Sequence, residues 1–189
     1  METTVNTQTN YSLAPLNNDA MACFESDRQN FAWYAAYTCA RHEKYVSRQL
    51  QDRAIENFLP TYRSVRHWKD RRKEIELPLF PGYVFIRLLN DDRIRVLEIP
   101  GVVRFVSFNG KPACLQSSEI ESLRNGVGNG IHAEPHPYLK VGQRVRVKYG
   151  PLAGTEGILL RKKDHLRLVI SLDLIMRSIA AEVQATDLE

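Results

Sequence analysis

At 189 residues, 43% of them hydrophobic, the chain is long enough for one large domain or two small ones with real cores. Its net charge of +4 is uneven: residues 1–30 carry −3, residues 31–126 carry +5 and residues 127–189 carry +2. No apolar run approaches the ~20 residues of a membrane span, no secretory signal opens the chain, and three cysteines lack metal-like spacing. We therefore expect a cytoplasmic protein with no metal, no cofactor and no membrane contact.

The first thirty residues are rich in Asn, Thr and Gln and show no apolar periodicity. This composition predicts a flexible tail over 1–30. Within it, Ala20, Met21, Cys23 and Phe24 would form a small apolar stripe if residues 19–27 were helical.

Residues 31–124 alternate between the periods of strands and helices. Val46, Leu50 and Ala54 recur at i, i+4 and i+8, which predicts an amphipathic helix over 41–54. The remaining patterns predict strands at 33–38, 58–65, 74–86, 102–108 and 113–115, and helices at 91–99 and from 117 onward. This order predicts an α+β domain whose antiparallel sheet is covered by helices.

The second half of the chain follows a stretch with three glycines and two prolines, residues 125–137, which predicts a linker and loosely coupled halves. From 138 to 189 apolar residues alternate in period two, with strands near 157–163, 165–173 and 178–184. Short strands without a helical segment predict a small β-barrel.

Residues 77–86 (Leu-Pro-Leu-Phe-Pro-Gly-Tyr-Val-Phe-Ile) are the most informative stretch. Pro78 and Pro81 cannot donate to a strand ladder, so they mark an edge, a bulge or a break. Phe80 between them is either a core phenylalanine beside a proline bulge or an aromatic anchor for a partner.

Three motifs in order identify a resemblance. They are Phe80-Pro81-Gly82-Tyr83-Val84-Phe85, then Pro100-Gly101-Val102-Val103, and finally Gly150-Pro151-Leu152-Ala153-Gly154 after a basic strand. Over 31–189 the chain resembles the NusG-type transcription elongation factors, with an NGN domain over 31–124 and an SH3-like KOW barrel over 138–189.

The resemblance implies a binding protein that sits on the clamp coiled coil of bacterial RNA polymerase and suppresses pausing. In such proteins the contact surface is an apolar, concave face of the sheet. The matching positions are Tyr37, Phe80, Pro81, Tyr83, Phe85, Phe105 and Phe108. Strand alternation puts Tyr83 and Phe85 on one face, and at least two of the seven are expected to be ordinary core.

A basic segment lies between two predicted strands. It is either a solvated hairpin tip or a contact for the non-template DNA strand, with cations on phosphates and Trp68 stacked on a base. Helix 91–99 adds two arginines at a position that the resemblance links to the same strand. The candidate residues are Arg66, His67, Trp68, Lys69, Arg71, Arg72, Lys73, Arg93 and Arg95.

The KOW half implies a second partner, either a small-subunit ribosomal protein or the termination factor Rho. The expected motif and partner residues are Gly150, Pro151, Gly154, Gly157, Leu174, Ile175 and Arg177. The family's Ile-Phe-Gly-Arg stretch corresponds here to Leu174-Ile175-Met176-Arg177, so a phenylalanine and a glycine are replaced. This departure puts Rho contact in doubt.

The polar tail, the basic segment and these replacements favour a specialised paralogue that promotes antitermination on specific long operons. We also expect a monomer. A housekeeping elongation and termination factor is the alternative within the family, and a ribosome-associated RNA-binding protein is the alternative outside it. Catalysis is not expected, because Asp91-Asp92 reads as a helix cap and Cys39 with His42 lacks a third catalytic group.

Overall fold

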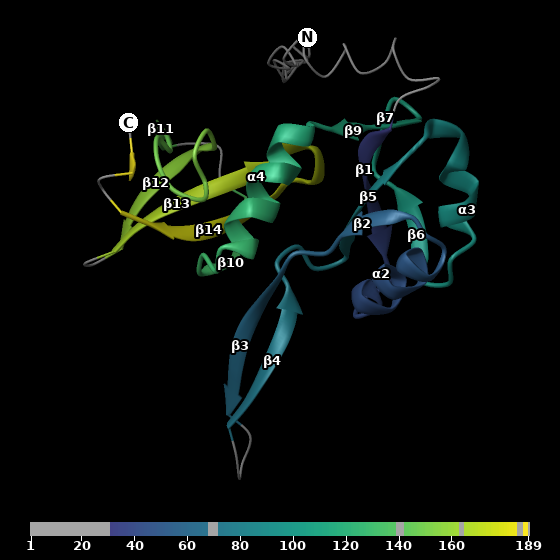
Figure 1. The fold of residues 1–189 in the computed structure, drawn as a ribbon, viewed down its shortest axis with the longest axis horizontal. Coiled ribbons are helices and arrows are strands. Elements are labelled where there is room, and N and C mark those ends of the chain that lie inside the picture. The colour runs from purple at the N-terminus through teal and green to yellow at the C-terminus, as the bar shows by residue number, and fades with distance from the viewer. Residues whose placement is uncertain (1–30, 68–71, 139–141, 163–164, 185–186, 189) are drawn as a thin grey trace, which may run out of the picture.

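The structure is a computed structural model that describes residues 31–67, 72–138, 142–162, 165–184 and 187–188. Figure 1 shows an N-terminal sheet with helices, a C-terminal barrel beside it, and a long hairpin that projects from the body. The α+β prediction is confirmed. Among the described helices, none combines the length and apolar character that crossing a membrane requires. The predicted tail over 1–30 lies outside the described residues.

The N-terminal sheet has the strand order β2-β5-β1-β6, and β9 pairs with the start of β1. All of these pairings are antiparallel. The strands are β1 (Ala32–Thr38), β2 (Glu56–Phe58), β5 (Tyr83–Leu88), β6 (Val102–Phe105) and β9 (Cys114–Leu115). A second small hairpin consists of β7 (Ser107–Phe108) and β8 (Lys111–Pro112).

Two helices cover one face of this sheet, namely α2 (Glu43–Asp52) and α3 (Arg93–Leu97), which follows the short 3-10 helix η1 (Asn90–Asp92). The predicted stripe is confirmed at Val46 and Leu50, which are fully buried against the sheet. Ala54 does not extend it, because the helix ends two residues earlier and Ala54 has a φ of +56°.

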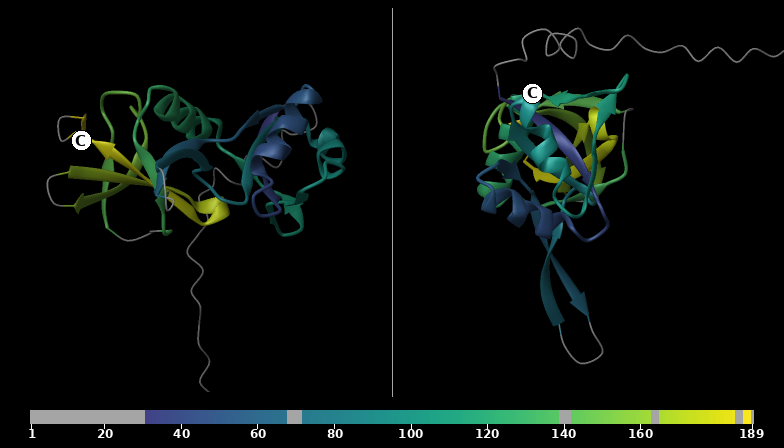
Figure 2. Two further views of the ribbon diagram at one scale, coloured as in Figure 1. Left: turned by 90° about the horizontal axis from the view of Figure 1, so that it is seen from below. Right: turned by 90° about the vertical axis from the view of Figure 1, so that its right-hand side faces the viewer.

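The hairpin consists of β3 (Thr61–His67) and β4 (Arg72–Pro78), which lie clear of the sheet in two orientations (Figures 1 and 2). Strand character was expected over 74–86, with an edge, a bulge or a break at the two prolines; in the structure β4 ends at Pro78 and β5 starts at Tyr83. The two prolines therefore mark a break, which sends the chain out into the hairpin and back into the sheet.

The predicted linker over 125–137 is shorter in the structure. Helix α4 spans Ser117–Gly128, strand β10 spans Ala133–His136, and only 129–132 lies between them. Glycine costs ~1 kcal/mol relative to alanine inside a helix, yet Gly126 is buried there. A Cβ at this position would lie 2.6 Å from Cδ2 of Leu152, so glycine is what allows the barrel loop to approach the helix.

The barrel is a five-stranded antiparallel sheet in the order β10-β14-β13-β12-β11. Its other strands are β11 (Gln143–Arg146), β12 (Glu156–Lys162), β13 (His165–Leu172) and β14 (Arg177–Val183), with the 3-10 helix η2 (Asp173–Ile175) before the last. The predicted turn glycines Gly150 and Gly154 have φ values of +85° and +84°, as the tight loop requires. The C-terminal β-domain is thus confirmed.

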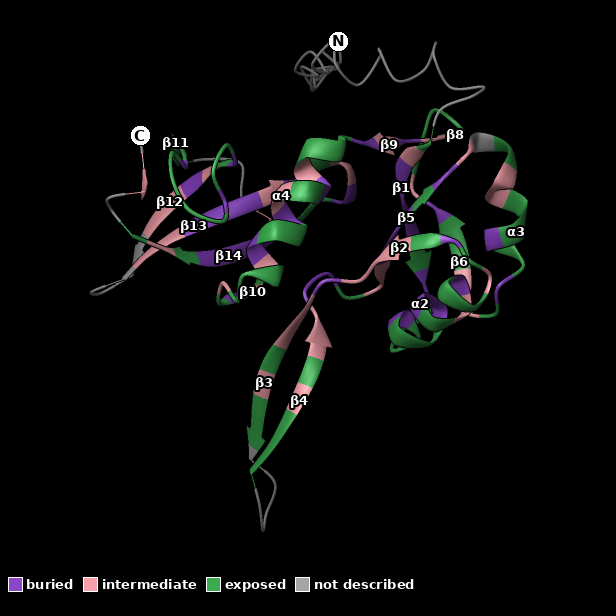
Figure 3. Ribbon diagram, in the orientation of Figure 1, coloured by how far each residue is buried: buried purple, intermediate pink, exposed green. Residues whose placement is uncertain are grey.

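One hydrophobic core joins the two halves. Buried positions in Figure 3 run from the sheet across α4 into the barrel. The cluster includes Trp33, Phe80, Phe85, Leu115, Ile120 and Leu123 on the N-terminal side, and Val145, Leu152, Leu168, Ile170, Leu172, Ile175 and Ile179 on the barrel side. The expectation of loosely coupled halves is therefore wrong for this structure, because the barrel packs on the sheet face that the helices α2 and α3 leave open.

Candidate functional site

The aromatic face of the N-terminal sheet is the candidate site, and its two central phenylalanines are buried. The exposed fraction of Phe80 is 1% and that of Phe85 is 0%. Their rings meet edge to face with centroids 5.5 Å apart, and Phe58 stacks on Phe85 at 6.3 Å. Such ring pairs add about 0.5–1.5 kcal/mol beyond the area they bury.

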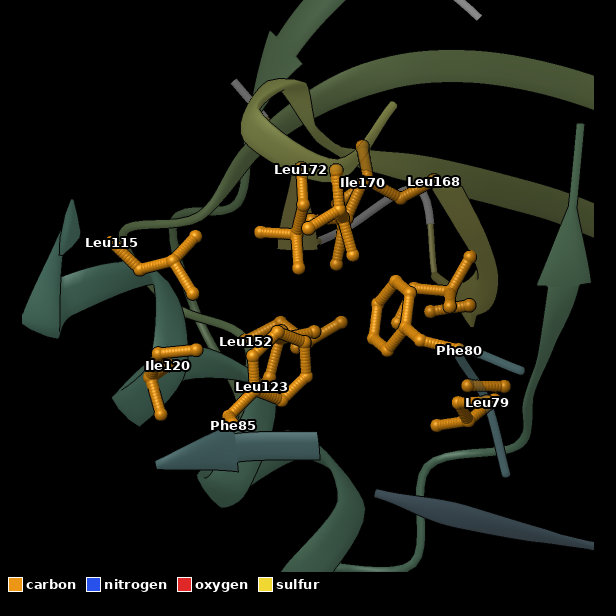
Figure 4. Close-up of a cluster of buried hydrophobic side chains, with 14 of the residues drawn as sticks. Leu79, Phe80, Phe85, Leu115, Ile120, Leu123, Leu152, Leu168, Ile170 and Leu172 are labelled. Carbon is orange, nitrogen blue, oxygen red and sulfur yellow. The ribbon is translucent and has the colours of Figure 1, made fainter. Parts of the chain in front are cut away.

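The barrel covers these rings. Figure 4 shows Phe80 opposite Leu168 and Ile170 of β13, while Phe85 lies by Leu123 of α4 and Leu152 of the barrel loop. Phe80 is therefore a core residue in this structure, within the core that the two halves share, and its role as an anchor for a partner stays a prediction.

Phe105 does not belong to this face. Its ring packs edge to face on Tyr34 at 6.0 Å, within the core beneath α2 and α3. The prediction that groups Phe105 with the contact residues is corrected by this position, because β6 alternation points its side chain to the helix-covered side.

The remaining predicted contact residues are not buried. Tyr37 and Tyr83 pack edge to face at 5.5 Å, and the guanidinium of Arg104 lies over the Tyr37 ring at 5.8 Å. Pro81 and Phe108 are exposed. The centre of the predicted contact surface is thus covered by the barrel, whereas Tyr37, Pro81, Tyr83 and Phe108 are at least partly accessible to solvent.

The predicted partner residues of the barrel lie at the same boundary. Ile175 is buried in the shared core, Leu174 packs against that core, and Arg177 is exposed at the start of β14. Gly150, Pro151 and Gly154 form the loop that carries Leu152 onto α4, whereas Gly157 lies inside the barrel, where a Cβ would meet the carbonyl oxygen of Val169 at 2.6 Å. Docking therefore occupies part of both predicted binding surfaces.

Met176 has a φ of +48° and a ψ of +47° at the end of η2, although its side chain is 64% exposed. This left-handed conformation costs a residue with a Cβ roughly 1–2 kcal/mol. We expect Met176→Gly to raise the free energy of unfolding by about 0.5–1 kcal/mol, measured by urea denaturation. Ala153→Gly, at an exposed loop position without positive φ, is the control and should lower it. Equal effects of the two changes would contradict the assignment of strain to Met176.

Glu43 and Arg124, which the sequence patterns did not single out, make contacts that hold the aromatic face in place. The backbone N–H of Gly82 donates a hydrogen bond of 2.8 Å to the buried carboxylate of Glu43. The guanidinium of Arg124 lies over the rings of Trp33 and Phe58, at 5.1 and 5.4 Å, and pairs with Glu56 at 3.2 Å. Because their partners are 39 and 68 residues away in sequence, no local pattern marks either residue.

Carboxyl groups from both halves meet near the same boundary. Burial raises the pKa of Glu119 in α4; a hydrogen bond with the backbone of Gln116 opposes the shift, and the charge of Asp173 in η2 adds to it. The hydroxyl of Tyr138 donates a 2.8 Å hydrogen bond to Asp173, and burial together with this bond raises the pKa of Tyr138 to about 12.

Among the described residues no three His, Cys, Asp or Glu side chains gather as a metal site would.

The predicted nucleic-acid residues fall in two separate places. On the hairpin, Arg66 lies directly opposite Lys73, and His67 lies opposite Arg72. Like charges that face each other across a strand pair, as those of Arg66 and Lys73 do, are destabilising. Arg63 instead pairs with Glu74 at 3.8 Å. Trp68, Lys69 and Arg71 lie outside the described residues.

The two arginines of α3 are on another part of the N-terminal half (Figure 1). Arg95 pairs with Asp92 at 3.3 Å, and its carbonyl oxygen accepts a hydrogen bond from Arg53. Arg93 lines a groove beside β6. The structure therefore does not gather the hairpin cations and the α3 cations into one surface.

Comparison with known proteins agrees with this architecture. The model of the NusG family, described as transcription termination factor nusG, matches residues 31–124. The chain is 27% identical over 170 residues to the transcription termination/antitermination protein NusG of Helicobacter pylori, with 83% of this chain and 97% of that protein covered. It is 29% identical over 170 residues to the protein of the same name from Campylobacter jejuni, covering 83% and 96%.

A solved structure described as "Domain interaction in Thermotoga maritima NusG" shares the fold, with a TM-score of 0.55 and 20% identity over 86% of this chain and 98% of that one. The motif order, the NGN-type sheet, the β-rich C-terminal domain and these matches agree, and the chain belongs to the NusG family of transcription factors.

Proposed function

We propose that this protein binds RNA polymerase at the clamp coiled coil through the aromatic face of its N-terminal sheet, suppresses pausing and promotes antitermination on specific long operons. The aromatic face is the observation that carries the proposal. A sheet that buries Phe80 and Phe85 under a separate β-domain has an apolar surface that a coiled-coil tip can occupy instead. The role is one of binding, without catalysis and without a cofactor.

Binding of this kind requires the barrel to move aside, because the central phenylalanines are covered. The apparent affinity of the chain for polymerase is then its intrinsic affinity multiplied by the fraction of open molecules. A partner that binds only the open form shifts the equilibrium by its differential affinity, so polymerase itself favours release of the barrel.

The experiment is a titration of RNA polymerase with variants in which the barrel is already released. In a Gly126→Leu background, where the new side chain would clash with Leu152 and is expected to release the barrel, Phe85→Ala should weaken binding by ~2–4 kcal/mol, about 30- to 1,000-fold. The open background matters, because in the native chain Phe85→Ala would loosen the barrel and weaken the polymerase contact at once.

Phe31→Ala in the same background is the matched control, since Phe31 is exposed just before β1. Folded protein is verified by circular dichroism. If Phe85→Ala and Phe31→Ala bind polymerase equally well, the aromatic face is not the contact surface.

The hairpin is proposed as the contact with the non-template DNA strand. Arg66 and Lys73 share one face of the hairpin, whereas Arg72 lies on the other, so cations are present on both faces of its outer part. The projection of β3 and β4 from the body would let this end reach a strand that the sheet does not touch. Trp68 would supply the base-stacking ring.

A housekeeping role is the second candidate. The relatives named as termination/antitermination proteins favour it, as does retention of Arg177 after η2. In that role Leu174, Ile175 and Arg177 would bind a small-subunit ribosomal protein or Rho once the barrel is released. A pull-down of Rho by the Gly126→Leu variant would favour this role, and a gene position at the head of a long operon would favour the specialised one.

A further inference from the structure

A groove of about 700 Å³ runs beside β6 and is shared by the two halves. Its N-terminal side includes Leu97, Val103 and Arg104, and its barrel side includes Met176. Drug-sized ligand sites span 300–1,000 Å³, so the groove has room for several side chains. It is separate from the buried rings of Phe80 and Phe85, which do not line it.

The lining of the groove is apolar and cationic. Val103 is 51% exposed and Met176 is 64% exposed, and Leu97 is also solvent-accessible. Arg93 and Arg104 supply positive charge, and no aspartate or glutamate is among the described residues that line it. Exposed apolar side chains gathered around a hollow indicate a binding surface, and this one matches an acidic, amphipathic segment.

The chain itself contains such a segment. Residues 19–27 read Asp-Ala-Met-Ala-Cys-Phe-Glu-Ser-Asp, with three acidic residues and no cation. Met21 and Phe24 are spaced i, i+3, which would place both on one side of a helix. The segment thus complements the groove in charge and in apolar character.

The position of the chain's first strand makes the groove reachable. Residues 28–31 connect this segment to β1 and span at most ~14 Å. The start of β1 pairs with β9, in the register Tyr34 to Cys114, and Pro112, two residues before Cys114, lines the groove. One end of the groove is therefore close to the point at which the segment joins the folded body.

We propose that residues 19–27 bind in this groove and hold the barrel closed over the aromatic face. A segment seated there contacts Val103 and Arg104 of the N-terminal half together with Met176 of the barrel, so its binding favours the docked arrangement. Binding of residues 19–27 in the groove depends on the docked arrangement of the two halves and requires no polymerase. Only its consequence, control of access to the aromatic face, rests on the proposed function.

The test is disulfide trapping within the full-length chain, using native Cys23. In a Cys39→Ser/Cys114→Ser background, Val103→Cys should cross-link to Cys23 under mild oxidation at least 10-fold faster than Val65→Cys. Val65 is the matched control, because it is an exposed strand valine on the projecting hairpin. Met176→Cys tests the barrel side of the groove independently and should also cross-link rapidly.

Charge reversal tests the specificity of the contact. Glu25→Lys should slow the cross-link to Val103→Cys several-fold, whereas Glu2→Lys, an identical change outside the segment, should leave it unchanged; 0.5 M NaCl should slow it too. Peptide mapping by mass spectrometry identifies the bonded pair. Equal rates at positions 103 and 65, equal effects of the two lysine variants, or a cross-link found only between two molecules would overturn the proposal.

Discussion

Gly126→Leu is expected to separate the barrel from the N-terminal sheet, whereas Gly128→Leu leaves them docked. Both glycines are in the last turn of α4. A Cβ at position 126 would lie 2.6 Å from Leu152, whereas at position 128 it would meet nothing within 4 Å. Overpacking of a core typically costs 1–3 kcal/mol, which corresponds to a shift of the docking equilibrium of roughly 5- to 150-fold.

The helix itself should tolerate both changes, since leucine is a better helix former than glycine. The variants thus differ in the contact with the barrel and not in local propensity. Small-angle scattering should show a larger radius of gyration for Gly126→Leu, and Trp33 should emit at longer wavelength when Trp68→Phe leaves it as the only tryptophan. Indistinguishable scattering curves for the two variants would mean that the Gly126–Leu152 contact does not control docking.

Neutralising the hairpin cations is expected to remove most of the chain's affinity for single-stranded DNA. Five phosphate contacts from Arg66, Lys69, Arg71, Arg72 and Lys73 would give a log–log salt slope near −3.5, at ~0.7 per phosphate. Affinity should then fall about 100-fold between 50 and 200 mM salt. The variant with all five changed to glutamine should show a slope near zero, lose pausing control and still bind the clamp coiled coil.

Arg63→Gln is the control on the same hairpin. Its guanidinium already pairs with Glu74, so its removal should leave the salt slope unchanged. Fluorescence anisotropy with a labelled oligonucleotide measures the slope directly. A salt slope near zero in the native chain, together with full pausing control in the variant with five substitutions, would show that the hairpin is a solvated tip and does not contact DNA.

Local patterns predicted much of the fold. The spacing of Val46 and Leu50 marked the buried face of α2. Pro78 and Pro81 marked an edge, a bulge or a break, because proline lacks the donor that a strand needs, and the structure shows that it is a break. The loop glycines Gly150 and Gly154 marked the barrel turn through their need for positive φ. In each case the physical cause lies within a few residues of the pattern, so the sequence alone determined the α+β domain, the barrel and the turn between its strands.

Tertiary structure alone decided how the two halves meet and hence what the aromatic face contacts. Strand alternation grouped Tyr83 with Phe85, but it gives no information on which face distant residues 168–172 cover. The sequence predicted that Gly126 belongs to a linker, because glycine disfavours helices. In the structure it lies in α4, where the absence of a Cβ allows Leu152 to pack against the helix. A pattern of side chains in the sequence defines an apolar face. Which segment covers that face and removes it from water depends on packing between segments far apart in sequence, so it is fixed only when the chain folds.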